Sequence, residues 1–389
     1  MGSKKKNLKY WIGKIHLWLG LASGLIVVFL GITGCMLAFE REIESVTTGY
    51  RYIKNEQQPF LPPSALKTRA QQALPGKLPH SVSYFPEDRA AEVAFFAVEP
   101  SYYYIVYLNP YSGKVLKVKN MDRDFFRIIL MGHYYLWLPP AIGQPIVASA
   151  TLIFVIMLIT GLVLWWPKNL AARKQRFTVK WNARWRRVNY DLHNILGFYI
   201  TWIILITALT GLVMGFQWFA KTVYWTASGG KSQVAYYEPF SKKAPHVTSG
   251  AVPATDRVWE KMKAEYPHTQ MIEVHFPESD TASIGAVANP DIATYWKQDI
   301  RYFDRHTLEE IPVTHAYGRF AAASAADKLT RMNYDIHVGA ILGLPGKIMA
   351  FCASLIAASL PVTGFYIWWG RRHKKSKAHP VPARRAALV

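Results

Sequence analysis

Cysteine is nearly absent from this chain. The 389 residues include only Cys35 and Cys352, and both lie in long apolar stretches. Two isolated cysteines exclude a disulfide framework, a Cys-x-x-Cys redox site and an iron–sulfur cluster, because each of these needs more thiols or a closer spacing. We therefore expect both side chains to be buried in apolar packing.

Acidic residues are missing from three segments that are rich in Lys and Arg. Residues 1–15, 167–188 and 370–389 carry 20 of the 46 basic residues and no Asp or Glu. The other 26 basic residues nearly balance the 25 acids, so the net charge of +21 resides in these segments. Such confinement fits a membrane topology better than a nucleic-acid-binding surface, and we expect no nucleic-acid partner.

Four apolar stretches are long enough to cross a lipid bilayer, which requires about 20 residues. They lie at about 17–39, 146–166, 192–219 and 346–369. Because basic loops stay in the cytoplasm, all three basic segments fall on one side when the chain crosses four times. This predicts a multi-pass membrane protein with both termini in the cytoplasm and two larger segments, 42–130 and 222–330, outside.

The sequence around the spans repeats. The heptads RVNYDLH (187–193) and RMNYDIH (331–337) are nearly identical, and each runs into an apolar stretch. Every span also ends with a Thr-Gly pair; the pairs are Thr33-Gly34, Thr160-Gly161, Thr210-Gly211 and Thr363-Gly364. We interpret these pairs as small residues that allow close helix packing in lipid.

The Thr-Gly pairs also show which spans correspond. Each Thr follows a histidine at the mouth of a span, by 17 residues in spans one and three and by 27 and 26 residues in spans two and four. The histidines are His16, His193, His133 and His337. This spacing predicts a parallel two-fold internal repeat with its axis along the membrane normal.

The two outer segments repeat a weaker pattern. Each starts with a short amphipathic stretch, at 64–74 and at 256–266, that predicts a helix with a Ser or Asp cap. A strand–turn–strand pattern follows in each, at 102–118 and at 295–311. We therefore expect each outer segment to be a small α+β domain.

The four histidines predict two cofactor sites. The topology places His16 and His193 at the cytoplasmic ends of their spans, and His133 and His337 at the outer ends. In the predicted repeat, equivalent helices face each other, so the four form one pair near each membrane face. Facing neutral imidazoles suit the axial positions of haem iron, whereas zinc needs three or four ligands at one place. The alternative is that the histidines are polar anchors at the membrane surface.

Glycines and arginines near the histidines extend this hypothesis. Gly20 and Gly197 follow a histidine by four residues, on the same helix face, where they either leave room for a flat macrocycle or serve helix packing. Arg127, Arg187 and Arg331 precede a histidine by six residues and are suitable partners for haem propionates. The alternative for the arginines is positive charge on the cytoplasmic side, which does not favour the two on the outer side.

Two further features surround the histidines. Asp191 and Asp335 are expected in the first turn of their helices, where they either complement the helix dipole or orient the second histidine nitrogen. The proline-containing stretches 138–145 and 342–346 interrupt the helices after the two outer histidines. We therefore expect His337 to lie on a separate short turn outside the main span, and His133 likewise.

With these motifs, the chain resembles the PepSY-associated transmembrane family of bacterial inner membranes. The resemblance is carried by KIHLWLGLASGLIVVFLGITG at the start, by NYDLH and NYDIH, by TGLVLWWP and by LNPYSGKVL. It implies that the outer segments are periplasmic PepSY-like domains. Some members are iron-regulated ferrisiderophore reductases that hold haem within their spans, so the resemblance also implies a ferric siderophore as substrate.

The predicted fold is a mainly α membrane protein, with four transmembrane helices as a two-fold internal repeat and two periplasmic α+β PepSY-like domains. The predicted boundaries are 1–41 (N-terminus and first span), 42–130 (first outer domain), 131–166 (outer ligand segment and second span), 167–188 (basic loop), 189–221 (third span), 222–330 (second outer domain), 331–370 (outer ligand segment and fourth span) and 371–389 (basic tail).

The predicted function is a two-haem-b electron conduit of the bacterial inner membrane that reduces a periplasmic ferric siderophore. No Gly-x-Gly-x-x-Gly or P-loop stretch is present, so an external donor, cytoplasmic or quinol, is expected. Two alternatives remain open. One is a membrane-anchored PepSY binding or regulatory protein without redox activity, and the other is a reductase of another metal such as copper.

Overall fold

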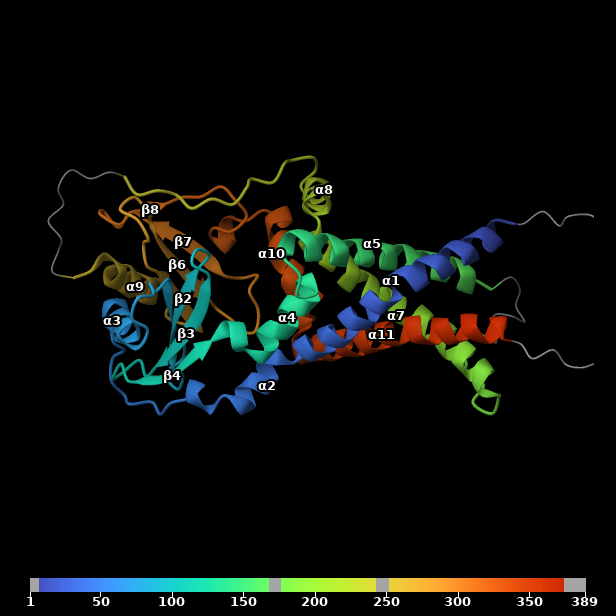
Figure 1. Ribbon diagram of the computed structural model, residues 1–389. Helices are drawn as coiled ribbons and strands as arrows, with labels where there is room; N and C mark the ends of the chain where they lie inside the picture. The colour runs from blue at the N-terminus through green and yellow to red at the C-terminus, as the bar shows by residue number, and fades with distance from the viewer. Residues whose placement is uncertain (1–6, 168–175, 243–251, 374–389) are drawn as a thin grey trace, which may run out of the picture.

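The structure is a computed structural model that describes residues 7–167, 176–242 and 252–373. Parts of the three predicted basic segments, at 1–6, 168–175 and 374–389, lie outside the described residues. Four long apolar helices form a bundle (Figure 1): α1 (Leu8–Ala38), α5 (Pro140–Trp165), α7 (Trp185–Gly215) and α11 (Gly343–Arg372). Each is long and apolar enough to cross a membrane, which confirms the four predicted spans.

The bundle is held by close packing of apolar and small side chains. Val27, Phe154, Ile204 and Leu212 belong to its buried core. Helices α1 and α11 approach closely at Gly31, where an added Cβ would lie 2.7 Å from the carbonyl oxygen of Ser354. Small residues allow such approach in lipid, where packing drives helix association.

The cysteines differ from the expectation of buried packing. Cys35 is half-buried and its thiol donates to the carbonyl oxygen of Phe351, at 3.4 Å. Cys352 is exposed on the outside of the bundle. The expectation was wrong for Cys352, because an apolar side chain in a membrane helix can face lipid as well as the helix core.

The outer segments share one sheet of eight antiparallel strands. Its order is β4-β3-β2-β1-β5-β6-β7-β8, so each outer segment contributes four neighbouring strands. The strands are β1 (Ser81–Tyr84), β2 (Ala91–Ala97), β3 (Tyr102–Leu108), β4 (Val115–Asn120), β5 (Met271–His275), β6 (Ile284–Asn289), β7 (Asp299–Phe303) and β8 (Glu310–Ile311). The halves join where β1 pairs with β5, with Val82 opposite Val274. The two predicted α+β units therefore form one continuous body.

Two helices cover the sheet, α3 (Pro63–Ala73) and α9 (Ala254–Glu265), as predicted. Their predicted caps were wrong. The N-cap residues are Pro62 and Pro253, and neither makes a side-chain cap. Instead, the Asp256 carboxylate accepts hydrogen bonds from the backbone nitrogen and the hydroxyl of Ser64, at 2.8 and 2.5 Å. The two residues thus join the helices of the two halves. Both predicted hairpins are present, as β3–β4 and β7–β8.

Short helices lie where the sheet meets the bundle or, in the case of α8, beside that end of the bundle (Figure 1). They are α2 (Glu40–Thr47), α4 (Phe125–Tyr135), α8 (Gln217–Ala227) and α10 (Ala325–His337), with the 3-10 turns η1 (Gly49–Arg51), η2 (Met121–Arg123), η3 (Phe320–Ala322) and η4 (Ala340–Leu342). The third span ends earlier than predicted, because α7 ends at Gly215 and α8 is a separate helix that begins at Gln217.

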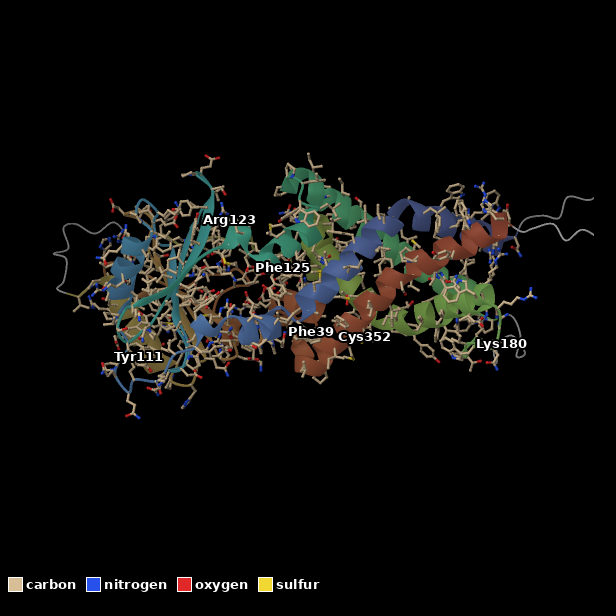
Figure 2. All side chains as sticks on the ribbon, turned by 60° about the horizontal axis from the view of Figure 1, so that its bottom comes forward. Phe39, Tyr111, Arg123, Phe125, Lys180 and Cys352 are labelled. Carbon is tan, nitrogen blue, oxygen red and sulfur yellow. The ribbon has the colours of Figure 1, made fainter. Side chains whose placement is uncertain are left out.

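The molecule has two distinct ends. The sheet lies at one end of the bundle, which we call the sheet end, and the first turn of α1 and the last turn of α11 lie at the other, the tail end (Figure 1). Figure 2 shows Lys180 at the tail end, Tyr111 within the sheet body, and Phe39 and Phe125 at the junction between sheet and bundle.

Candidate functional site

The four histidines occupy both ends of the bundle. His16 and His193 belong to the long helices α1 and α7. His133 lies near the end of the short helix α4, and His337 is the last residue of α10. The prediction that the latter two precede their spans on separate short segments is confirmed, since α5 and α11 begin only at Pro140 and Gly343.

His133 and His337, the sheet-end pair, face each other. Their ring centres are 6.4 Å apart and the ring planes are inclined at 66°. Both rings line a cavity of about 470 Å³ between α1, α4, α5, α7, α10 and α11. The lining is mostly apolar and includes Leu30, Phe154 and Ile204. The volume falls within the range of roughly 300–1,000 Å³ that is usual for small-molecule and cofactor sites.

His16 and His193, the tail-end pair, are arranged differently. Neither ring lines the cavity at the sheet end. Among the described residues, ring contact between two of the four histidines occurs at the sheet end alone, so the pairing of His16 with His193 stays a prediction.

In the first half of the bundle, each histidine contacts the Thr of a Thr-Gly pair on another helix. Nδ1 of His16 lies 2.9 Å from the hydroxyl oxygen of Thr160 in α5. Nδ1 of His133 lies 2.8 Å from the hydroxyl oxygen of Thr33 in α1. Helix α1 is therefore joined to α5 at the tail end and to α4 at the sheet end.

The second half repeats these contacts. Nδ1 of His193 lies 2.9 Å from the hydroxyl oxygen of Thr363 in α11, and Nδ1 of His337 lies 3.0 Å from that of Thr210 in α7. Among the described residues, no hydrogen bond involves the Nε2 atom of any of the four rings. Each ring is therefore held by one nitrogen and presents the other.

The Gly of each Thr-Gly pair lies against the same histidine ring. An added Cβ would lie 3.6 Å from Cε1 of the ring at Gly34, 3.4 Å at Gly161, 3.3 Å at Gly211 and 3.2 Å at Gly364. The sequence predicts general helix packing for the Thr-Gly pairs, and the structure shows a more specific contact, with the histidines. The constant spacing in the sequence joins each Thr to the histidine of its own span, whereas the contacting histidine belongs to another span, so the spacing marks equivalent positions but not this contact.

The repeated heptads contain a second contact. The side-chain amide of Asn189 donates to the backbone carbonyl of Thr363, at 3.0 Å, and Asn333 donates to that of Thr210, at 3.1 Å. In each heptad, Asn and His lie four residues apart on one helix face and bind the backbone and side chain of one Thr. Sequence reasoning missed these asparagines.

The heptad aspartates do neither of the two things expected of them. Asp191 forms an ion pair with Arg187, at 2.9 Å. Asp335 accepts hydrogen bonds from the backbone nitrogens of Tyr295 and Trp296, both at 2.9 Å. Neither lies in the first turn of its helix, because α7 and α10 begin several residues earlier. Neither bonds to a histidine, since the threonines take that place.

The three arginines have partners outside the cavity lining. Arg187 pairs with Asp191. The Arg127 guanidinium lies 4.7 Å from the ring centre of Tyr103. Arg331 is buried and donates to the carbonyl oxygen of Gly318, at 2.7 Å, while its Nη1 has no hydrogen-bond partner. Their contact with haem propionates remains a prediction.

Gly20 and Gly197 pack against neighbouring helices. An added Cβ at Gly20 would lie 2.8 Å from Cε of Met157, and one at Gly197 would lie 3.6 Å from Cδ2 of Leu360. These contacts favour the helix-packing alternative over the room for a macrocycle. The glycines that line the sheet-end cavity are Gly31, Gly34, Gly211 and Gly215. Gly34 and Gly211 belong to the Thr-Gly pairs, whereas sequence reasoning did not single out Gly31 or Gly215.

Polar side chains lie where the cavity approaches the sheet. Glu40, Tyr134 and Tyr334 contribute to the lining. The Tyr334 ring centre is 5.6 Å from that of Tyr295, over which the Arg41 guanidinium lies at 4.7 Å. Burial raises the pKa of the Glu40 carboxyl, and it also raises the pKa of the Tyr334 hydroxyl. The cavity is thus apolar in the bundle and polar toward the sheet.

The histidines occur as pairs rather than as larger clusters. Within residues 7–167, 176–242 and 252–373, no group of three or more His, Cys, Asp or Glu side chains is arranged to hold a metal ion.

A family model described as the PepSY-associated TM region matches residues 14–371. A comparison with curated proteins finds no match.

Proposed function

Because the chain belongs to the PepSY-associated transmembrane family, and because His133 and His337 face each other in an apolar cavity, we propose that it is a membrane-embedded electron conduit with two haems b. The single observation that carries the proposal is this facing pair. The proposed substrate is a ferric siderophore, whose iron is reduced from Fe(III) to Fe(II).

His133 and His337 would hold the iron of the sheet-end haem. A metal–imidazole bond is roughly 2 Å long, so two imidazoles on one metal hold their ring centres about 6 Å apart. The observed 6.4 Å agrees with this separation. A bis-imidazole haem supplies one-electron transfer when bound. The protein contributes the fixed rings, the apolar lining and the close approach at Gly34 and Gly211.

The tail-end pair, His16 and His193, is the proposed holder of the second haem. Its threonine contacts match those at the sheet end in partner atoms and in length. Basic residues such as Lys9, Arg371 and Arg372 lie in the terminal turns of α1 and α11 at this end. Basic segments favour the cytoplasmic side, so the proposed orientation has both termini in the cytoplasm and the sheet in the periplasm of a bacterial inner membrane.

In this proposal, electrons enter at the tail end and leave at the sheet end. The donor is either a cytoplasmic reductant or a quinol. One electron converts one ferric ion to ferrous, and the softer, less charged Fe(II) binds hard oxygen ligands of a siderophore more weakly. The polar side chains between cavity and sheet, among them Tyr334 and Tyr295, lie on the side where the chelate would approach.

Oriented membrane vesicles test the direction of transfer. We expect an impermeant ferric chelate to be reduced only when it is offered at the sheet side. The His337→Ala variant is expected to lose this reduction while the tail-end haem still accepts electrons. Equal rates from both sides, or full activity in the variant, would contradict the conduit and favour a membrane-anchored binding or regulatory protein. Replacing the ferric chelate with a cupric one tests the alternative of copper reduction.

A further inference from the structure

We propose that Thr33, Thr160, Thr210 and Thr363 are positioning residues that each accept the Nδ1 proton of a histidine and thereby leave the Nε2 lone pair free for a metal. The role in metal binding rests on the proposed haem function, whereas the position of the proton follows from the hydrogen bonds alone. The four contacts, at 2.8 to 3.0 Å, recur at both ends and in both halves of the bundle.

The hydroxyl proton of each threonine is already used within its own helix. A threonine hydroxyl has a single proton and two acceptor lone pairs. In all four threonines the hydroxyl donates within its own helix, to Phe29, Ile156, Ile206 and Ser359 at 2.8 to 2.9 Å. With that proton committed to a backbone carbonyl, the oxygen can only accept from the histidine. Nδ1 must therefore be the protonated nitrogen.

His337 supports the same assignment independently. Its Nδ1 also lies 3.0 Å from the backbone carbonyl oxygen of Thr207. A carbonyl oxygen has no proton to donate, so this contact requires a proton on Nδ1. The hydroxyl of Thr210, at 3.0 Å from the same nitrogen, is then an acceptor as well. The other three histidines repeat the contact with Thr.

The consequence is a set of four prepared ligands. A neutral imidazole with its proton on Nδ1 has its lone pair on Nε2. A partner on the other nitrogen fixes the ring orientation and raises the basicity of the ligand, and its removal typically costs about 10- to 100-fold in metal affinity. The glycine after each Thr keeps the space beside Cε1 of the ring open.

The two histidines of the sheet-end pair differ in the number of acceptors for the Nδ1 proton. His337 has two acceptors for its Nδ1 proton, the Thr210 hydroxyl and the Thr207 carbonyl. Among the described residues, His133 has the Thr33 hydroxyl alone. Removing the Thr33 hydroxyl should therefore change the tautomer of His133 more than removing the Thr210 hydroxyl changes that of His337, although both rings line the same cavity.

The test compares Thr33→Val, which removes the hydroxyl and keeps the shape, with Thr33→Ser, which keeps the hydroxyl. Thr330→Val is the matched control, because Thr330 donates to the carbonyl oxygen of Ala326 within its own helix, at 3.0 Å, and lies outside the cavity lining. The full chain is labelled with ¹⁵N at histidine and studied without haem in detergent micelles. We expect the Nδ1–H tautomer in the wild type, in Thr33→Ser and in Thr330→Val, and a mixture of the two tautomers for one ring in Thr33→Val.

Titration with hemin gives a second readout. Thr33→Val should weaken binding at the sheet-end site about 10- to 100-fold, Thr210→Val less than Thr33→Val, and Thr33→Ser and Thr330→Val only slightly. An Nε2–H tautomer in the wild type, or identical behaviour of the Ser and Val variants, would overturn the assignment. If the Nδ1–H tautomer is found but wild-type protein binds no hemin, the proposed haem function fails while the role of the threonines stands.

Discussion

The sheet-end and tail-end histidine pairs have the same supports but different surroundings. Each ring is held through Nδ1 by a threonine. At the sheet end, the rings lie on the short helices α4 and α10 and face each other across a cavity. At the tail end, they lie within the long helices, and Gly20 beside them packs against Met157.

The same Thr–His contact therefore occurs in two different surroundings. The tail-end histidines lie within the long helices α1 and α7. The sheet-end histidines lie on α4 and α10, which connect the sheet to the bundle, so these two short helices contribute both to the cavity and to the junction with the sheet. We infer that the sheet end is the end suited to contact with a soluble substrate.

The largest effects are expected when one histidine of either pair is replaced. His337→Ala should remove the sheet-end haem and abolish chelate reduction, whereas His193→Ala should remove the tail-end haem and leave the other bound. The reason is that, in the proposed function, each pair would hold its own haem iron. Pyridine haemochrome content per chain measures both outcomes. His80→Ala and His268→Ala are controls that should retain both haems, and loss of both haems from one ligand change in a folded protein would argue against independent pairs.

A second comparison uses the glycines beside the rings. Gly364→Ala would place a Cβ 3.2 Å from Cε1 of His193, whereas Gly34→Ala would place one 3.6 Å from that of His133. The first contact is tight and the second is ordinary, so Gly364→Ala should destabilise the protein by about 1–3 kcal/mol, as overpacking does, and Gly34→Ala by less. Thermal unfolding and the spectrum of the tail-end haem measure the effect. Equal tolerance of both changes would contradict the described ring positions.

A smaller effect is expected from the heptad asparagines. Asn189→Ala and Asn333→Ala each remove a hydrogen bond to a Thr carbonyl, at 3.0 and 3.1 Å. Each change should lower the free energy of unfolding by about 0.5–1.5 kcal/mol without changing haem content. The measurement is chemical denaturation of purified protein. Loss of haem from either variant would mean that Asn, rather than Thr, is the main support of the histidine.

The smallest predicted effect lies in the sheet and leaves both pairs intact. Burial alone would raise the pKa of Glu310, but hydrogen bonds from Arg319 and Arg301 lower it from 4.5 to about 2. The carboxylate therefore stabilises the fold above pH 4.5, and this contribution is lost as pH falls toward 2. The difference in unfolding free energy between wild type and Glu310→Gln should shrink over this window. A difference that does not depend on pH there would contradict the ion-pair network.

Much of the bundle could be predicted because lipid imposes simple rules. Apolar length predicted the four spans, and the constant spacing between His and Thr predicted which helices correspond. The hairpins followed from local turn residues such as those around Gly113, whose φ of +71° suits glycine. These features depend on short stretches of sequence.

The remaining features depend on contacts between distant residues. The pairing of β1 with β5 joins two segments separated by two spans, and no local pattern specifies that edge. Whether Thr or Asp would face a histidine depends on helix rotation and on where α7 and α10 begin. The partner of Arg331 is the backbone carbonyl of Gly318, in a loop 13 residues earlier in the chain, and no local pattern predicts that contact.

The haem content of the purified full chain tests the central proposal most directly. The protein is expressed with sufficient iron, and the pyridine haemochrome assay is combined with visible spectra before and after dithionite. We predict two non-covalent haems b per chain, with a Soret band that shifts on reduction. Well under one haem per chain in folded protein would contradict the proposed conduit.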